Sequence, residues 1–177
     1  MTGEEIRRYL EASYDKWINT IAKTDDRLLQ IEAREDARTQ QARWSFVNRS
    51  YNFDSAAGII YTVDVTKPFG ERVAIASMAD GSAFDLQKEY NVAMTSYRAS
   101  GGGGLMKETG IDTDNIDARV TGRYPEIRNI LYDYLVENGS IDPEVIGDPA
   151  VIGHWEFVPE QLVKPAMERD MDLLFKR

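Results

Sequence analysis

The sequence predicts an α+β domain in which helices cover a mixed, mostly antiparallel sheet. Apolar residues recur at helical spacing at the start of the chain and again between residues 124 and 139, and two stretches rich in β-branched residues lie between them. The chain has 177 residues, of which 42% are hydrophobic and 29% charged, so it can bury one packed core. The order of helix, strands and helix therefore favours a single α+β domain.

The first helix is expected to begin directly after Thr2, because Thr2 and Glu5 form the pattern of a capping box. Apolar residues then follow at helical spacing, and they are Ile6, Leu10, Tyr14, Trp17 and Ile21. A helix that begins directly after the second residue favours the interpretation that the chain was cut from a longer protein at the boundary of a secondary-structure element.

Residues 24–43 are strongly polar, and we expect a solvated helix or a mobile excursion there rather than a charged binding site. Strands are predicted at Ile59–Val65 and Val73–Met78, since both are rich in β-branched residues and turn residues separate them. A third strand is predicted over Tyr90–Ser96, shortly before four consecutive glycines.

A second helix is expected to start near Pro125 and to end at Asn138-Gly139. Its predicted apolar stripe consists of Ile127, Ile130, Leu131, Tyr134 and Leu135. This stripe is expected to cover part of the sheet.

The C-terminal part contains two further apolar segments. Trp155–Val158 is apolar and aromatic, and a last amphipathic stretch covers residues 165–175. We expect residues 1–158 to form the domain and residues 159–177 to be a helical extension of it.

The composition excludes several classes of function. Thirty acidic against 21 basic residues give a net charge of −9, which argues against a nucleic-acid or anionic-membrane binder. Without cysteine there is no disulfide scaffold or cysteine nucleophile, and a single histidine, His154, makes a serine triad or a multi-histidine metal site hard to build. No stretch reaches the ~20 apolar residues of a membrane span, and no signal-peptide pattern opens the chain.

The four glycines, Gly101 to Gly104, mark the candidate binding site. They match neither a P-loop, which needs Gly-Lys-Ser/Thr, nor a dinucleotide fingerprint, which needs a helix directly behind it. They follow Tyr97 and Arg98, so an aromatic ring and a guanidinium lie beside bare backbone. That arrangement can stack a planar ring, and the alternative is a flexible tight turn without a ligand.

Three stretches of sequence occur in an order that is typical of one family. They are YNFDSAAGIIYTVDVTKPFGERV at residues 51–73, Asp80-Gly81 followed by YNVA at residues 90–93, and YRASGGG at residues 97–103. Together with the opening TGEEI they resemble the C-terminal domain of the bacterial 5′-nucleotidase family, above all its 2′,3′-cyclic-nucleotide 2′-phosphodiesterase/3′-nucleotidase branch. The resemblance covers most of residues 1–158 and implies that family's C-terminal-domain fold.

The resemblance implies that the chain is the nucleoside-binding domain of a metal-dependent hydrolase of nucleotide phosphate esters. In that family an N-terminal metallophosphatase domain holds two divalent metal ions, and the C-terminal domain sandwiches the base between two aromatic rings. Tyr97 matches the second of these aromatics, whereas the first lies upstream of the opening helix and outside this chain. The expected nucleoside contacts are Tyr97, Gly101, Gly102 and Gly103, with no catalytic or metal-binding residue in this chain.

Arg98, Phe53 and Tyr51 are further candidates for nucleoside binding, although Tyr51 and Phe53 are expected mainly as anchors of the core and sheet. Many members of the family carry an Asp that supports nucleoside binding where this chain has Gly103, and an Asn where it has Ser96. The hydrogen bond that this Asp offers is therefore not expected here.

The function expected from the resemblance is hydrolysis of nucleotides by a periplasmic or secreted bacterial enzyme, with this fragment inactive by itself. The expected partners are a nucleotide or nucleoside and the N-terminal metallophosphatase domain of the same polypeptide, and nucleic acid is not among them. The alternative is a non-catalytic binding or interaction module that keeps the fold, which Gly103 and the polar residues 24–43 favour.

Overall fold

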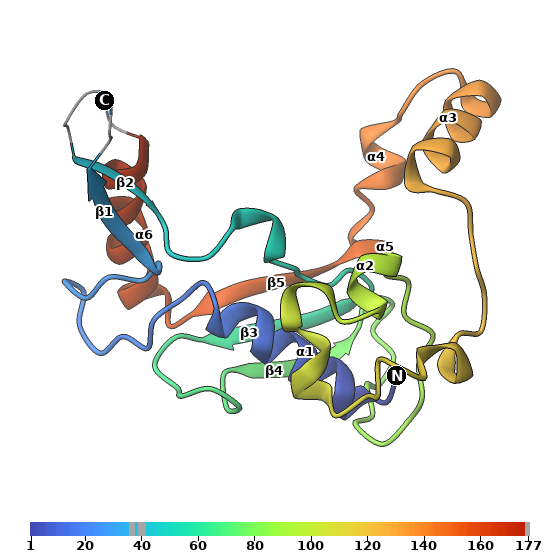
Figure 1. Ribbon diagram of the computed structural model, residues 1–177, viewed down its shortest axis with the longest axis horizontal. Helices are drawn as coiled ribbons and strands as arrows, with labels where there is room; N and C mark the ends of the chain where they lie inside the picture. The colour runs from blue at the N-terminus through green and yellow to red at the C-terminus, as the bar shows by residue number, and fades with distance from the viewer. Residues whose placement is uncertain (36–37, 39–41, 176–177) are drawn as a thin grey trace.

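The computed structural model describes residues 1–35, 38 and 42–175. Figure 1 shows a body built from α1 and the strands β3, β4 and β5, flanked by one projection with β1, β2 and α6 and by another with α3 and α4. In chain order the elements are α1 (Gly3–Asp15), β1 (Ile31–Glu35), β2 (Ala42–Phe46), η1 (Ser50–Asn52), β3 (Ile59–Asp64), β4 (Val73–Met78), α2 (Ser96–Ala99), η2 (Gly102–Gly104), η3 (Met106–Thr109), η4 (Ile116–Arg119), α3 (Ile127–Asn138), α4 (Pro143–Ile146), α5 (Pro149–Ile152), β5 (Gly153–Val158) and α6 (Glu160–Phe175).

Helix α1 begins where the capping box predicts. The Thr2 hydroxyl accepts a hydrogen bond from the Glu5 amide (3.2 Å), and the Glu5 carboxylate accepts one from the Thr2 amide (2.7 Å). These bonds satisfy amide groups that a helix N-terminus otherwise leaves without a partner. Leu10 and Tyr14 of the predicted apolar stripe are buried, so the amphipathic helix is confirmed.

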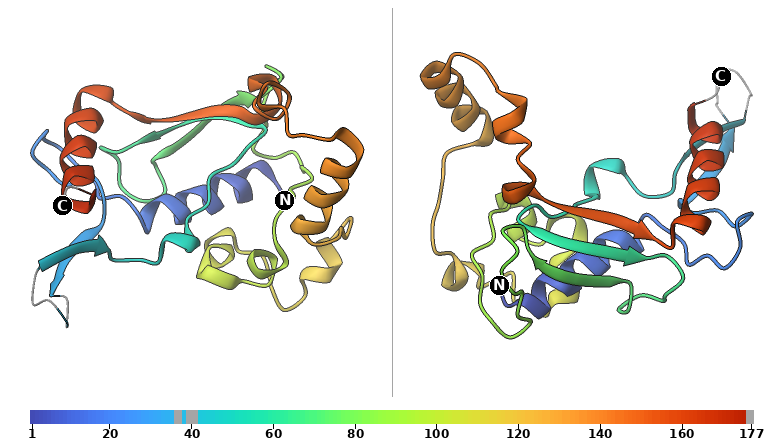
Figure 2. Two further views of the ribbon diagram at one scale, coloured as in Figure 1. Left: turned by 90° about the horizontal axis from the view of Figure 1, so that it is seen from above. Right: turned by 180° about the vertical axis from the view of Figure 1, so that it is seen from behind.

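The sheet that α1 covers has three strands in the order β4–β3–β5 (Figure 2). Strand β3 pairs antiparallel with β4 and parallel with β5, and the separate β1–β2 pair is antiparallel. The predicted mixed, mostly antiparallel arrangement is therefore confirmed. Side chains alternate along β3, and Ile59, Tyr61 and Val63 are buried in the same core as the residues of α1.

A cluster of aromatic rings joins α1 to the sheet. The Tyr14 ring is fully buried, and its hydroxyl is hydrogen-bonded to the Tyr61 hydroxyl (2.9 Å), as a buried polar group requires. Ring centroids within 6.3 Å of Tyr14 belong to Phe53, Tyr61, Trp155 and Phe157. Trp155 and Phe157 come from β5, so the apolar segment predicted near the C-terminus completes the core.

The described part of residues 24–43 contains no helix, so the solvated helix, one of the two forms expected there, is wrong. The described residues of this segment supply β1 and the start of β2. These two strands pair with each other in a register that places Ile31 opposite Phe46. Residues 36–37 and 39–41 lie outside the described part of the chain. The polar segment forms a strand because β2 brings Trp44 and Phe46 beside it, and this tertiary pairing outweighs the local charge pattern.

The strand predicted over Tyr90–Ser96 is wrong. Pairing ends at Tyr90, where the Met1 amino group donates to the Tyr90 carbonyl (2.9 Å) and the Tyr90 amide donates to the Met1 carbonyl (2.8 Å). Within the described residues no strand lies beside residues 91–95, and Ser96–Ala99 forms the short helix α2 instead. A β-rich sequence forms a strand only beside a backbone with which it can pair.

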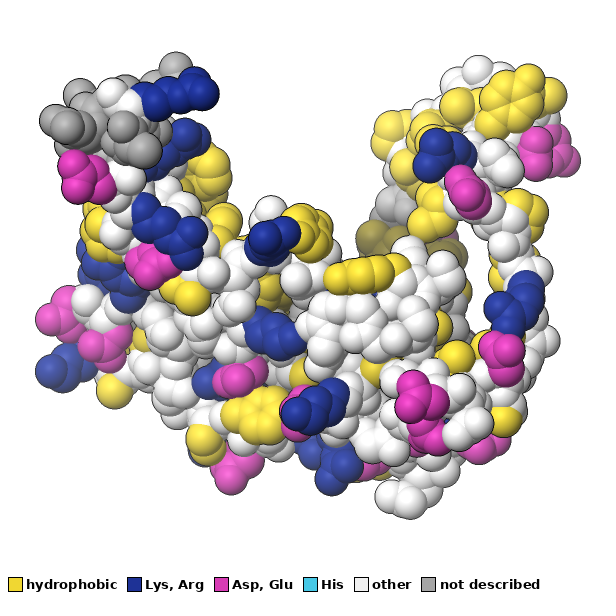
Figure 3. Space-filling view, viewed as in Figure 1, with side chains coloured by type: hydrophobic (Ala, Val, Ile, Leu, Met, Phe, Trp, Pro, Cys, Tyr) yellow, Lys and Arg dark blue, Asp and Glu magenta, His cyan; other side chains and the backbone are white. Residues whose placement is uncertain are grey.

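Helix α3 is confirmed, but its packing differs from the expectation. The helix ends at Asn138, and Gly139 follows with a left-handed φ of 75°. Except for the half-buried Tyr134, its predicted apolar stripe is exposed, with Ile127 69% and Leu131 46% accessible. Figure 3 shows hydrophobic side chains over this projection.

Helix α6 begins at Glu160, earlier than the stretch predicted from Pro165, and includes that proline. Proline lacks a backbone N–H and usually marks the first turn of a helix, so its position in the sequence hid the true start. Val163 and Ala166 pack into the same core as α1 and β3. None of the described helices combines the length and the apolar character that crossing a membrane requires.

We predict that the free energy of unfolding falls as the pH rises above about 10. Burial, together with the hydrogen bond to Tyr61, raises the pKa of Tyr14 above its ordinary value, and burial also raises the pKa of Tyr61. The unfolded chain therefore loses these protons at a lower pH than the folded chain. Urea midpoints between pH 9 and about pH 11.5 should decline, with the steeper part above about pH 10.

Tyr14→Phe provides the control, because phenylalanine keeps the ring and has no proton to lose. Its unfolding free energy should fall less steeply with pH than that of the unmodified protein. The two slopes should differ by about 1.4 kcal/mol per pH unit in the alkaline range, the contribution of one proton. Equal slopes in the two proteins would contradict the assignment.

Candidate functional site

The short helix α2 presents Tyr97 at the surface of the body. The Thr95 hydroxyl caps this helix by accepting a hydrogen bond from the Arg98 amide (3.3 Å). The Tyr97 side chain is 53% exposed, so one part of its ring is open to a ligand. The sequence predicted Tyr97 at the end of a strand, but in the structure Tyr97 lies on a helical turn.

The glycines after α2 form a turn that only glycine can build. Gly101 and Gly103 have left-handed φ values of 90° and 78°, which residues with a side chain rarely adopt. Gly102 is needed for another reason, because a Cβ at this position would overlap the carbonyl and the ring of Tyr97. The Tyr97 ring consequently lies directly against the bare backbone of Gly102. Residues 101–104 are called the glycine turn below.

Arg98, next to Tyr97, points into the protein and is only 6% exposed. Its Nε and Nη2 donate to the two carboxylate oxygens of Asp54 (2.7 and 2.9 Å) in a bidentate ion pair. Nη2 also donates to the Tyr51 carbonyl (2.8 Å), and Nη1 donates to Asn52 Oδ1 (3.3 Å) and to the Gly102 carbonyl (3.2 Å). The guanidinium thus joins α2, the glycine turn and the segment around η1.

Side chains on one face of α1 and at its C-terminal end form hydrogen bonds to this network. The Tyr9 hydroxyl donates to Asp54 Oδ2 (2.5 Å), and the Ser13 hydroxyl donates to the Asp54 carbonyl (2.7 Å) and accepts from its amide (2.8 Å). The Lys16 ammonium donates to the Gly103 carbonyl. Sequence reasoning did not identify these residues, although their i, i+4, i+7 spacing places them on one helix face and was the available signal.

Two exposed side chains from the η1 segment lie on the same surface as Tyr97. Tyr51 is 62% exposed, and its hydroxyl accepts a hydrogen bond from Arg49 Nη1 (2.6 Å). This hydrogen bond raises the pKa of Arg49, and the nearby phenol of Tyr97 raises it additionally through its charge interaction. Because it is exposed, Tyr51 is not the anchor of the core that the sequence predicted. Phe53 turns inward and packs against Tyr14, as the anchoring role expected for it requires.

The electrostatics of the site follow from the ion pair. The hydrogen bond to Asp54 raises the pKa of Arg98, and burial together with the same carboxylate raises the pKa of Tyr9. Tyr9 is therefore a donor to Asp54 at any physiological pH. Because Arg98 and Asp54 neutralise each other, Arg49 and Lys16 leave positive charge at the site of a chain whose net charge is −9.

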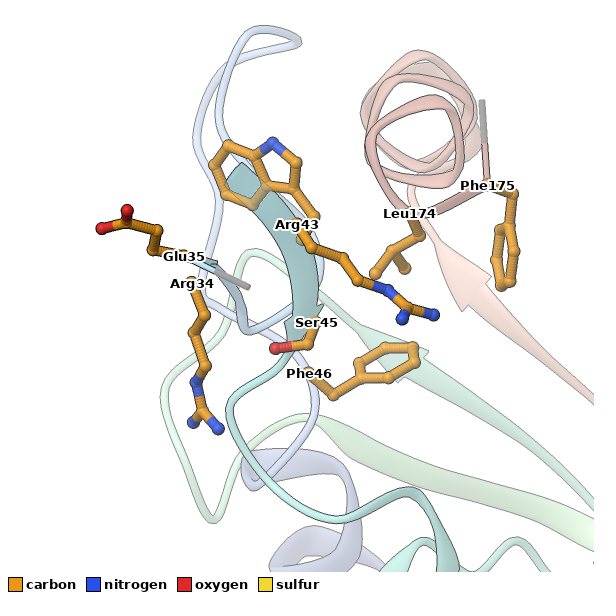
Figure 4. A pocket seen from close by; sticks show the side chains of 8 residues that line it. Arg34, Glu35, Arg43, Ser45, Phe46, Leu174 and Phe175 are labelled. Atoms are coloured by element: carbon orange, nitrogen blue, oxygen red, sulfur yellow. The ribbon is translucent and has the colours of Figure 1, made fainter. Parts of the chain in front are cut away.

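Two shallow hollows are lined by residues other than Tyr97. One, of about 460 Å³, lies behind the glycine turn and is lined by Gly101, Lys107 and Asp112 among others. The other, of about 440 Å³, lies between the β1–β2 pair and the end of α6, and Figure 4 shows Arg43 pointing into it between Phe46 and Leu174. Since Tyr97 lines neither of them, it offers an open stacking face rather than an enclosed pocket.

Across the described ranges, no three His, Cys, Asp or Glu side chains gather in a way that could hold a metal ion. His154 is exposed on β5, next to Trp155, which packs toward α1, so His154 faces the opposite side of the sheet. The arrangement around Tyr97 can bind and orient a planar group.

The structure is that of an α+β domain that presents an aromatic residue on a glycine turn. Residues 1–109 match the family model described as 5′-nucleotidase, C-terminal domain. The chain belongs to this family, and the resemblance noted in the sequence is confirmed.

Two curated relatives and one solved structure agree with this assignment. The chain is 30% identical over 192 residues to the trifunctional nucleotide phosphoesterase protein YfkN of Bacillus subtilis, an alignment that covers 99% of this chain and 12% of the relative. It is 28% identical over 169 residues to the 2′,3′-cyclic-nucleotide 2′-phosphodiesterase/3′-nucleotidase of Haemophilus influenzae, covering 89% of this chain and 22% of that protein. The chain thus spans less than a quarter of either relative.

The solved structure is a putative 5′-nucleotidase from Staphylococcus aureus in complex with alpha-ketoglutarate. It superposes with a TM-score of 0.58 at 22% identity, covering 89% of this chain and 26% of that one. This likeness supports the predicted fold.

Gly103→Ala is predicted to destabilise the protein more than Gly110→Ala. The two glycines have φ values of 78° and 79°, so the strain of a Cβ in the left-handed region, about 1–2 kcal/mol, is common to both. A Cβ at position 103 additionally meets Arg98 Nη1, whereas one at position 110 has nothing within 4 Å. Overpacking should add about 1–3 kcal/mol, which urea denaturation of both variants measures. Equal losses would show that Arg98 does not constrain this position.

Proposed function

We propose that this chain is the nucleoside-binding domain of a bacterial nucleotide phosphoesterase. The observation that carries the proposal is the half-exposed ring of Tyr97, seated on the glycine turn of a chain from the 5′-nucleotidase C-terminal family. The names of both curated relatives describe hydrolysis of nucleotide phosphate esters, which supports a nucleoside as the planar ligand.

In the proposed complex Tyr97 stacks on the base, and Gly101, Gly102 and Gly103 let the edge of the base approach the backbone. One aromatic stack contributes about 1–3 kcal/mol to binding. Tyr51 borders the same surface and is a further contact. Because Gly103 has no carboxylate, stacking rather than a side-chain hydrogen bond dominates recognition, and we expect little discrimination among bases.

Hydrolysis is assigned to another domain of the same polypeptide, since this chain spans only 12% and 22% of its curated relatives. A metallophosphatase domain with two divalent metal ions supplies the activated water and the polarisation of the phosphate in that proposal. The residues of this chain bind the nucleoside and orient its phosphate toward that domain. Nucleotide breakdown in the periplasm or outside a bacterial cell is the proposed setting.

A second candidate function is a non-catalytic binding or interaction module with the same fold. One observation favours it, namely Gly103 at the position where the family resemblance calls for an Asp. The open reading frame distinguishes the two functions, because metallophosphatase motifs rich in His and Asp encoded together with this chain support the enzyme.

Adenosine added to the ¹⁵N-labelled chain should shift the amide resonances of Tyr97 and of the glycine turn. Tyr97→Ala should weaken binding about 5- to 150-fold through loss of the stack, whereas Tyr97→Phe should bind as the unmodified chain does. Tyr124→Ala is the control, since it removes a more exposed tyrosine (82%) from the segment that precedes α3. Absence of shifts around Tyr97 at millimolar adenosine would contradict the binding role.

The purified 177 residues should hydrolyse neither AMP nor 2′,3′-cyclic AMP, even with added Mg²⁺ or Mn²⁺. The reason is that the groups beside Tyr97 bind and orient a ligand, while the proposed reaction takes place in another domain. Product formation is followed by chromatography, with the full polypeptide as the positive control. Robust metal-dependent hydrolysis by the isolated chain would overturn the assignment.

A further inference from the structure

Arg98 lies beside the proposed stacking residue but has no donor left for a ligand. All five of its N–H groups donate to protein acceptors, on Tyr51, Asn52, Asp54 and Gly102. The side chain is 6% exposed, and its charge is compensated by the bidentate contact with Asp54. Arg98 therefore acts on a ligand only through the groups that it holds.

Those groups belong to the residues that form the proposed nucleoside site. Nη1 is bonded to the carbonyl of Gly102, against whose backbone the Tyr97 ring lies. The Arg98 Cζ atom lies 5.3 Å from the centre of the Tyr97 ring, so the guanidinium also backs that ring. Nη2 is bonded to the carbonyl of Tyr51, the other exposed aromatic residue of the surface.

The acceptor on the other side of Arg98 is itself fixed to the core. Asp54 is bonded to Tyr9 and Ser13 of α1, and α1 packs on the sheet through the fully buried Tyr14. A continuous series of hydrogen bonds thus runs from α1 through Asp54 and Arg98 to the glycine turn. A turn of consecutive glycines has little conformational preference of its own, so its shape depends on such external contacts.

We propose that Arg98 is a positioning residue, which, together with Asp54 and Tyr9, holds the Tyr97 ring and the glycine turn in the conformation that binds the nucleoside. The inference rests on the proposed function for its ligand and on the hydrogen bonds above for its mechanism. A ring that is already in place binds without the ordering cost that a loose turn would add. Arg98 thereby contributes to affinity without touching the ligand.

The first experiment needs no ligand and measures backbone order in the free protein. In Arg98→Lys, the ammonium cannot reproduce the bidentate contact or the bonds to Tyr51 and Gly102. The amide order parameters of Gly102 and Gly103 should fall from about 0.85 to below about 0.6. The matched control is Arg72→Lys, which alters another buried arginine, 4% exposed and 3.2 Å from Asp15, and should leave both values unchanged.

The second experiment measures adenosine affinity in a double-mutant cycle. Arg98→Lys should weaken binding about tenfold, and Arg72→Lys should not change it. If Arg98 acts through Tyr97, the double variant Arg98→Lys/Tyr97→Ala should bind no more weakly than Tyr97→Ala alone. If Arg98→Lys does not fold, Tyr9→Phe replaces it, because it removes only the hydroxyl that anchors Asp54 and should loosen the same turn to a smaller degree.

Each outcome decides a separate point. Unchanged order of Gly102 and Gly103 in Arg98→Lys, or additive losses of affinity in the cycle, would overturn the positioning role. A loosened turn together with non-additive losses supports it. A loosened turn in a protein whose unmodified form binds no adenosine would refute the proposed function while supporting the role of Arg98 in holding Tyr97.

Discussion

The packing of helix α1 against strand β3 is the interaction on which the rest of the structure depends. Tyr14 enters the core with its hydroxyl satisfied by Tyr61, and rings from β5 and from the segment after η1 close around it. This contact fixes the rotation of α1 about its axis. With Tyr14 turned toward the sheet, Tyr9, Ser13 and Lys16 must face the segment that carries Asp54 and the glycine turn.

The Arg98–Asp54 ion pair is the second consequence of that rotation. A buried ion pair adds little net stability, because removing both charges from water offsets much of their attraction. It does specify geometry, since a planar guanidinium with all its donors engaged tolerates only one arrangement of its acceptors. The arrangement leaves the ring of Tyr97 on the surface and the guanidinium beneath it, which suits the proposed stacking on a planar ligand.

Much of the fold could be predicted from local patterns. The capping box at Thr2, the strand at Ile59–Val65, and the glycine that ends α3 are each dictated by residues within a few positions of one another. The strand expected over Tyr90–Ser96 failed because a strand depends on a partner distant in sequence. The helix considered for residues 24–43 failed because β1 and β2 pair with each other. The start of α6 was misplaced because Pro165 has the same local signature inside a helix as at its first turn.

For the proposed binding surface, the sequence by itself determined the chemistry, which is an aromatic ring beside a run of glycines. Only the tertiary structure decided that Arg98 points inward while Tyr97 points outward, and that Tyr9, Ser13 and Lys16 support them. The physical reason is that the direction of a side chain on a four-residue helix is set by its acceptors. Apart from the Gly102 carbonyl, the acceptors of Arg98 come from a segment about 45 positions away in the chain.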